Sequence, residues 1–209
     1  MSPAALRVRA DQAYCVFNKR VLGKESYTEQ EIIRGCRRQK RQFQELLYRK
    51  FYGFGMSVCL RYAYSRDDAM EVLNDAFMKV FEGIRTYDET KPFKSWFRRI
   101  LVNAALDHYR ATRKYRINMA LEDIDPDTGP LVEDNLTMGA DEILGLFDRI
   151  PDIYRVTFNL YEVEGYSHEE IAGMLDVSPG TSRSNLSRAK KMLRGLYLSQ
   201  RNKTCHEAV

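Results

Sequence analysis

The sequence predicts an all-α protein: two small helical domains joined by a flexible acidic linker, the second containing a helix-turn-helix. Gly and Pro are scarce, at 12 and 6 of the 209 residues, while good helix formers are common. Several stretches repeat their apolar residues at intervals of three and four, as one face of a helix does. A segment rich in acids, Pro and Gly lies between two basic helical regions, which is typical of an interdomain linker.

Composition argues against several other classes of protein. No run approaches the ~20 apolar residues of a membrane-spanning helix, and the N-terminus lacks the apolar block of a secretory signal. The four cysteines are scattered without a CxxC spacing, which favours reduced thiols in a cytosol over a disulfide framework. The three histidines show no ligand spacing with them. We therefore expect a cytoplasmic protein without a membrane span, a metal site or a cofactor.

Residues 1–27 show no clear period and are expected to form an N-terminal extension, followed by a first domain over residues 28–116. This domain opens with one or two helices before Ser65. Residues 66–85 form its clearest helix, because their apolar residues make one continuous stripe. The stripe consists of Ala69, Leu73, Ala76, Phe77, Val80 and Ile84.

A break at Pro92 separates this helix from another over residues 93–115. Its apolar stripe runs through Phe93, Phe97, Ile100, Leu101, Ala104 and Ala105. The rest of this region is basic and holds Lys94, Arg98, Arg99, Arg110, Arg113, Lys114 and Arg116. The first domain is therefore expected to end in a basic helix.

The charge reverses in the predicted linker, residues 117–139. No Lys or Arg occurs from Ile117 to Asp148. Acids are frequent there: Glu122, Asp123, Asp125, Asp127, Glu133, Asp134, Asp141 and Glu142. Fully extended, the ~23 linker residues could span ~75 Å. Two domains joined in this way could occupy distant sites on one partner.

The second domain is predicted over residues 140–200, with a tail at residues 201–209. Its first helices cover residues 140–149, the stretch from Pro151 to Gly165, and a helix introduced by a capping box of Ser167 and Glu170. Another helix then follows after the short turn Asp176-Val177-Ser178. Two helices joined so tightly are typical of a helix-turn-helix.

The second helix of this motif has two unlike faces. Ser178 suits its N-cap and Pro179 its first position. One face, which should pack, holds Ser182, Leu186, Ala189 and Leu193. The opposite face holds Arg183, Ser184, Ser187, Arg188 and Lys191, and no acid occurs from Pro179 to Lys203.

This free basic face predicts DNA binding. Arg can pair two donors with a guanine edge in the major groove, while Ser and Thr suit phosphates or base edges. The alternative is that the charges only keep a terminal helix solvated. The residues by themselves do not identify the kind of DNA-binding protein.

Together these segments resemble the bacterial RNA polymerase sigma factors of the extracytoplasmic-function (ECF) subfamily, over roughly Glu29 to Leu198. The stretch SRDDAMEVLNDAFMKVF is similar to the family's polymerase-clamp segment, although Asn74 stands where Gln is commoner. The resemblance implies that this helix faces the clamp helices of the largest core polymerase subunit, beta-prime. The implied contacts are Glu71, Asn74, Asp75 and Lys79. On the residues alone, they form an ordinary solvated helix face.

The stretch FKSWFRRILVNAALDHYR closely matches the family's F-x-x-W-L-x-x-I-x-x-N-x-x-x-D-x-x-R. The resemblance implies that this helix and the loop before it contact the −10 element as it melts, with Asn103 helping to hold a flipped base. Trp96 suits either stacking on a base or packing in the core. Asp107 is expected to order the basic helix rather than touch DNA. The implied −10 contacts are Tyr87, Lys94, Trp96, Arg99, Asn103, Arg110, Arg113 and Lys114.

The segment from Arg149 to Tyr197 matches the family's C-terminal domain, including its E-G-x-S-x-x-E-I-A pattern. The resemblance implies that this domain reads the −35 element in duplex DNA and touches the flap of the beta subunit. The implied −35 contacts are Thr181, Arg183, Ser184, Ser187, Arg188 and Lys191. Ser182 replaces the usual Val on the packing face, so whether this helix packs against its neighbours as in the family is an open question.

The sequence therefore predicts a transcription initiation factor that gives core polymerase its promoter selectivity and is not itself an enzyme, since it shows no catalytic constellation. The family also implies an anti-sigma factor as partner and a linker that threads the path of the nascent RNA, although a plain soluble tether explains the linker equally well. Two alternative functions remain: a stand-alone helix-turn-helix regulator, usually dimeric, and an interaction adaptor. Two basic helices in separate domains disfavour the adaptor.

Overall fold

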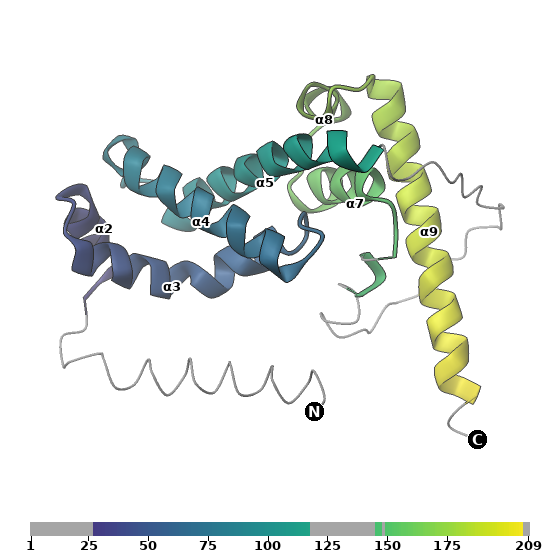
Figure 1. The fold of residues 1–209 in the computed structure, drawn as a ribbon, viewed down its shortest axis with the longest axis horizontal. Coiled ribbons are helices and arrows are strands. Elements are labelled where there is room, and N and C mark those ends of the chain that lie inside the picture. The colour runs from purple at the N-terminus through teal and green to yellow at the C-terminus, as the bar shows by residue number, and fades with distance from the viewer. Residues whose placement is uncertain (1–26, 118–144, 148, 207–209) are drawn as a thin grey trace. The chain divides into compact units, whose positions relative to one another are not determined.

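The structure is a computed structural model that describes residues 27–117, 145–147 and 149–206. Every regular element in these ranges is a helix, which confirms the predicted all-α class (Figure 1). Apart from Tyr27 and Ile117, the predicted N-terminal extension and linker lie outside the described residues, as does most of the predicted helix 140–149. No helix in the described part is both long enough and apolar enough to cross a membrane.

The chain divides into two compact units after Leu47. The first unit contains α2 (Glu29–Arg37) and the start of α3 (Arg41–Cys59). The hydroxyl of Thr28 accepts from the N–H of Glu31 at 3.3 Å, and the Glu31 carboxylate accepts from the N–H of Thr28 at 2.7 Å. This capping box satisfies backbone donors that the start of a helix leaves free.

α2 lies close to the start of α3 because Gly35 faces Phe43. A Cβ at Gly35 would lie 2.1 Å from Cγ of the Phe43 ring, so a larger residue does not fit there. The ring of Tyr27 meets Phe43 edge-on, with the centroids 5.1 Å apart. These contacts fix the turn between the two helices, in which Gln39 takes a left-handed conformation with φ 56°.

In the second unit α4 (Arg66–Gly83) packs along α5 (Phe93–Ile117), and a short 3₁₀ helix, η1 (Ile84–Thr86), follows α4. α4 begins with a capping box between Ser65 and Asp68. All residues of its predicted apolar stripe are buried: Ala69, Leu73, Ala76, Phe77, Val80 and Ile84. The periodicity in the sequence therefore located the core face of this helix.

The core between α3, α4 and α5 is aromatic. The ring centroids of Phe51 and Phe93 lie 4.7 Å apart, and those of Phe77 and Phe97 lie 4.9 Å apart. These are favourable distances for aromatic pairs. The core fixes which side of α5 is left exposed.

The C-terminal part of the second unit consists of α7 (Asp152–Phe158), a π-helical turn η2 (Asn159–Val163), α8 (His168–Leu175) and α9 (Pro179–His206). Gly165, with φ 78°, follows η2 and ends this helical run, as predicted. α8 begins with the predicted capping box of Ser167 and Glu170. Hydrogen bonds from the backbone and side chain of Ser167 lower the pKa of Glu170.

α8, a tight turn and α9 form the predicted helix-turn-helix. α8 ends at Leu175, and the next residue, Asp176, takes the left-handed conformation with φ 54°. α9 starts after Ser178, whose Oγ accepts from the N–H of Thr181 at 3.0 Å. Both α7 and α8 pack against α9. The second helix of the motif is therefore held by two others and keeps one face exposed.

Candidate nucleic-acid interface

The first candidate surface is the face of α9 that its neighbours leave uncovered. The predicted packing residues Ser182, Leu186 and Ala189 are at most 7% exposed. The predicted −35 contacts Thr181, Arg183, Ser184, Ser187 and Arg188 are exposed, and Lys191 is half-buried. The helical spacing thus separated most buried positions from exposed ones, but Leu193, which was expected to pack, is only half-buried, and the buried Asn185 was missed.

Two arginines on this face make only weak contacts within the protein. Arg183 Nη2 lies 2.9 Å from Glu169 Oε1, and both side chains are mostly exposed, at 58% and 65%. Exposed ion pairs of this kind contribute little stability. Arg188 Nη1 donates to the hydroxyl of Tyr154 over 3.4 Å, which is a long hydrogen bond. Both guanidinium groups can therefore be released to DNA at low cost.

Ser182 stands on the buried side of α9 and has 0% of its surface exposed. Its Oγ lies 2.9 Å from Nδ1 of His168, at the start of α8. The imidazole of His168 stacks on Tyr161, with the centroids 4.5 Å apart. The Ser182 hydroxyl, at a position where the family usually has Val, is therefore buried but has a hydrogen-bond partner. The pair joins the two helices of the helix-turn-helix.

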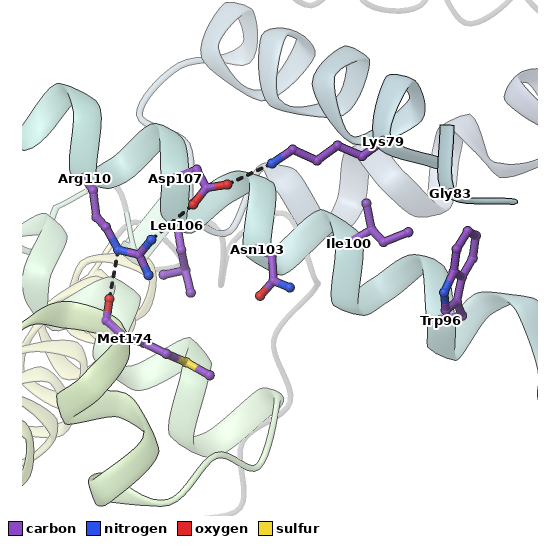
Figure 2. A pocket seen from close by; sticks show the side chains of 9 residues that line it. All are labelled: Lys79, Gly83, Trp96, Ile100, Asn103, Leu106, Asp107, Arg110 and Met174. Atoms are coloured by element: carbon purple, nitrogen blue, oxygen red, sulfur yellow. Dashed lines mark hydrogen bonds and ion pairs between the residues drawn. The ribbon is translucent and has the colours of Figure 1, made fainter. Parts of the chain in front are cut away.

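The second candidate surface is a hollow of about 460 Å³ beside α5 (Figure 2). It is lined by Lys79, Gly83, Trp96, Ile100, Asn103, Leu106, Asp107, Arg110 and Met174. In Figure 2 the exposed amide of Asn103 lies between Trp96 and Arg110. An indole ring, an amide and a guanidinium group along one helix suit an unstacked base and its phosphate.

Asp107 orders the basic groups around this hollow, as expected from the sequence. Lys79 Nζ lies 2.8 Å from Asp107 Oδ2, and Arg110 Nη1 lies 3.1 Å from Asp107 Oδ1 (Figure 2). The first of these ion pairs directs Lys79, a predicted polymerase contact, towards α5.

The other predicted polymerase contacts, Glu71, Asn74 and Asp75, are exposed on α4. Tyr48 donates its hydroxyl proton to Asn74 Oδ1 at 3.2 Å, which orients the amide. The three residues form an acidic and polar surface that is available to a partner, whereas Lys79 belongs to the hollow.

Tyr87 and Trp96, both predicted −10 contacts, take part in aromatic packing at the start of α5. Tyr87 is 5% exposed, packs edge-on against Phe93 with centroids 5.5 Å apart, and donates its hydroxyl proton to the carbonyl of Lys91. The ring of Trp96 lies 5.1 Å from that of Tyr87. Burial gives Tyr87 a packing function, while Trp96 both packs and lines the hollow.

The remaining predicted −10 contacts are basic. Lys94 and Arg99 are exposed, and Lys94 Nζ lies 5.7 Å from the centroid of the Phe54 ring. Arg113 and Lys114 belong to α5, but their side chains lie outside the described residues. Lys94, Arg99 and Arg110 therefore form the described cationic part of this surface.

Two contacts from the C-terminal helices to α5 were not predicted from the sequence. Glu164, just after η2, accepts from Arg98 Nε at 2.6 Å. Arg110 Nε donates to the backbone carbonyl of Met174 in α8 at 3.0 Å (Figure 2). The partners are 66 and 64 positions apart in the sequence, and no local pattern marks them.

Two cysteines are free thiols in the interior of the folded protein. Cys36 and Cys59 are free and buried, and burial raises the pKa of each thiol to about 12. Burial therefore keeps both thiols protonated near neutral pH, where a thiol is a poor nucleophile. Over the described ranges, no group of three His, Cys, Asp or Glu side chains could hold a metal ion.

Two family descriptions match the parts of the chain that hold these surfaces. Sigma-70 region 2 matches residues 47–115, which include α4 and all but the last two residues of α5. Sigma-70, region 4 matches residues 140–193, which include α7, α8 and the exposed face of α9. The chain belongs to the sigma-70 family of RNA polymerase sigma factors.

Curated relatives narrow this assignment. The chain is 29% identical over 174 residues to the ECF RNA polymerase sigma factor SigE of Mycolicibacterium smegmatis, covering 80% of this chain and 63% of that relative. It is 24% identical over 183 residues to the ECF RNA polymerase sigma-E factor of Haemophilus influenzae, covering 81% of this chain and 95% of the relative. The corresponding Escherichia coli K12 protein is 25% identical over 180 residues, with 81% and 94% covered. Within the sigma-70 family, the chain is a member of the ECF subfamily.

Two solved structures are also similar to the chain, each with a TM-score of 0.44. CnrH, in complex with the cytosolic domain of CnrY, is 17% identical and is matched over 80% of this chain and 96% of that chain. The sigma factor RpoE from Bartonella quintana, in complex with the anti-sigma factor NepR, is 18% identical, with 73% and 95% covered.

Proposed function

We propose that this chain is a dissociable initiation factor that binds core RNA polymerase and directs promoter-specific transcription. The proposal rests above all on the exposed basic face of α9, which stands in a helix-turn-helix within the region 4 match. The polymerase performs the chemistry, while this chain contributes promoter choice and assists strand separation. We also propose that the chain acts in the cytoplasm beside the polymerase, without a cofactor and without enzymatic activity of its own.

In the proposed mechanism α9 enters the major groove of the −35 element. Arg188 pairs with a guanine edge, and Arg183 exchanges Glu169 for the DNA. Thr181, Ser184, Ser187 and Lys191 contact phosphates or sugars, which position the helix without reading sequence. The buried pair of Ser182 and His168 keeps the helix in register with α8.

The −10 element is proposed to be held as a single strand along α5. The hollow beside Asn103 receives an unstacked base, whose edge the amide recognises through hydrogen bonds. Lys94, Arg99 and Arg110 supply cationic contacts to the strand. Capture of an unpaired base offsets part of the cost of opening the duplex.

The partners follow from the same assignment. We propose that Glu71, Asn74 and Asp75 contact the clamp helices of the beta-prime subunit, and that the helix-turn-helix domain also contacts the flap of the beta subunit. An anti-sigma factor is proposed as a regulator on the strength of the family resemblance.

Transcription by core polymerase on a promoter library tests this function. With the chain added, the sequenced RNAs should start downstream of a shared pair of −35 and −10 motifs. A selectivity no greater than that of core polymerase alone would refute the proposal. If the chain alone bound a DNA site of two paired half-sites tightly, without polymerase, the result would instead support a stand-alone regulator.

A further inference from the structure

The turn between α2 and α3 (Figure 1) holds a cluster of basic residues that none of the proposed contacts includes. Five of them occur within eight positions: Arg34, Arg37, Arg38, Lys40 and Arg41. No Asp or Glu occurs from Ile32 to Gln44. We propose that this basic turn, residues 34–41, is a third nucleic-acid surface, which binds the sugar-phosphate backbone of promoter DNA. The inference rests on the proposed function, because the promoter complex is what brings DNA to the chain.

The cations at the centre of the basic turn are available to a partner. Arg38, Lys40 and Arg41 are exposed, and within the described ranges their side chains form no ion pair or hydrogen bond. By contrast, Arg183 on α9 has a carboxylate oxygen of Glu169 2.9 Å away. Three unneutralised cations within four positions produce a positive potential that attracts anions.

The backbone of the basic turn is fixed by hydrogen bonds. The N–H of Gln39 donates to the carbonyl of Cys36 at 2.8 Å. The N–H of Lys40 donates to the carbonyl of Gly35 at 3.2 Å. With Gln39 in the left-handed conformation, these two bonds form the Schellman motif that commonly ends a helix. The cations therefore stand on a preformed backbone, so that binding a partner orders only their side chains.

The cations of the basic turn do not stabilise the helix that follows. α3 begins at Arg41, directly after Lys40, and its first turn contains no acid. The first turns of α2, α4 and α8 each contain two acids. Because the N-terminus of a helix carries partial positive charge, cations are unfavourable there. Residues that oppose a local rule in this way are expected where function requires them.

The chemistry of the exposed side chains favours nucleic acid over protein as the partner. Residues 38–42 are all exposed, and all are Arg, Lys or Gln. The centre of a protein–protein interface is enriched in aromatic and Met side chains, which these five positions lack. Protein–DNA interfaces are more polar and more positively charged, and Arg, Lys and Gln side chains donate to phosphate oxygens. Backbone contacts carry no sequence information, so the basic turn should strengthen binding equally on all promoters.

Neutralising Arg38 and Arg41 together tests the proposal, with Arg66 and Arg85 as the matched control. R38Q/R41Q and R66Q/R85Q each remove two exposed cations, and neither Arg66 nor Arg85 belongs to a proposed contact surface. Fluorescence anisotropy of a labelled promoter duplex, titrated with holoenzyme over a salt series, measures the slope of log affinity against log salt concentration. We expect R38Q/R41Q to reduce this slope by about 2, because each phosphate contact contributes about 0.9, and R66Q/R85Q to leave it unchanged.

Charge-preserving substitution separates a DNA contact from a folding defect. R38K/R41K should keep the wild-type slope, because a phosphate contact requires a positive charge but not a guanidinium fork. Circular dichroism should show the same helical content in all variants. Gln42→p-benzoylphenylalanine places a photo-crosslinking group at an exposed position in the first turn of α3, where it should react with promoter DNA.

Three results would overturn the proposal. The first is an equal salt slope for wild type and R38Q/R41Q. The second is an equal reduction of the slope in both double variants, which would reflect net charge rather than a contact. The third is a loss of affinity of R38Q/R41Q for core polymerase alone, with the crosslink from position 42 formed only to a polymerase subunit. That result would assign the basic turn to a protein partner.

The same experiments distinguish failure of this inference from failure of the proposed function. If wild type directs selective transcription while R38Q/R41Q keeps the wild-type slope, the DNA contact of the basic turn is refuted and the function stands. If wild type itself gives no selective RNA with core polymerase, the function is refuted, and the promoter contact of the basic turn is refuted with it.

Discussion

At the scale of single residues, Arg188 and Lys191 lie on the same face of α9 but are expected to serve different purposes. Arg188→Ala should relax preference at one −35 position and cost about 1–3 kcal/mol on the matched promoter. Lys191→Ala should weaken binding about equally on all promoters, because a phosphate contact carries no sequence information. Competition between matched and mismatched promoters for the holoenzyme measures both effects. Equal losses on the two classes of site for Arg188→Ala would show that it does not read a base.

The buried pair of His168 and Ser182 should be energetically coupled. Ser182→Ala removes a hydrogen bond and should lower the free energy of unfolding by about 1 kcal/mol, whereas His168→Ala also leaves the Ser182 hydroxyl buried without a partner. The double variant should therefore be less destabilised than the sum of the single variants. Urea unfolding of all four proteins gives the coupling energy. Additive losses would mean that the two side chains act independently.

The burial and the partners of single residues were also the features least predictable from sequence. The family resemblance implies that Tyr87, in the loop before α5, is a −10 contact, but its burial against Phe93 depends on how that loop folds back. In the sequence, Arg98 is one of several basic residues on the same helix, and nothing distinguishes it from the others. Its partner Glu164 is 66 positions away, and only the folded chain brings the two together.

At the scale of elements, local signals predicted most of the fold. The stripe of α4 and the capping box of Ser167 are patterns within a few residues, and both appear as expected. A T-x-x-E pattern of the same kind at Thr28 marks the capping box that begins α2. The π-helical turn η2 had no such signal, because a shift of hydrogen-bond register inside a helix leaves the apolar spacing almost unchanged.

The capping box of α8 should make the stability of that helix depend on pH. Hydrogen bonds from Ser167 lower the pKa of Glu170 in the folded chain, so the unfolded chain binds this proton more readily. The stabilisation is therefore present above the ordinary pKa of a glutamate and is lost as pH falls through the lowered value. The difference in unfolding free energy between wild type and Glu170→Gln should shrink over that interval. A difference that stays constant from neutral to acidic pH would contradict this account.

At the scale of the whole molecule, charge is distributed unevenly although the net charge is only +4. The proposed DNA surfaces on α5 and α9 are cationic, while the proposed polymerase surface on α4 is acidic and polar. The logarithm of the holoenzyme's affinity for promoter DNA should fall linearly with the logarithm of the salt concentration, because each neutralised phosphate releases counterions. Titrations over a salt series should show a slope reduced by about 1 for Lys191→Ala. An affinity independent of salt would exclude phosphate contacts as its main source.

The position of Trp96 has a practical consequence. It is the single tryptophan of the chain, and it lines the hollow in which Asn103 and Met174 also take part. Indole emission responds to solvent and is quenched by a stacked nucleobase. The molecule thus contains its own optical probe at the place where a base would arrive, so the capture of that base can be timed by stopped-flow fluorescence without a dye or a mutation.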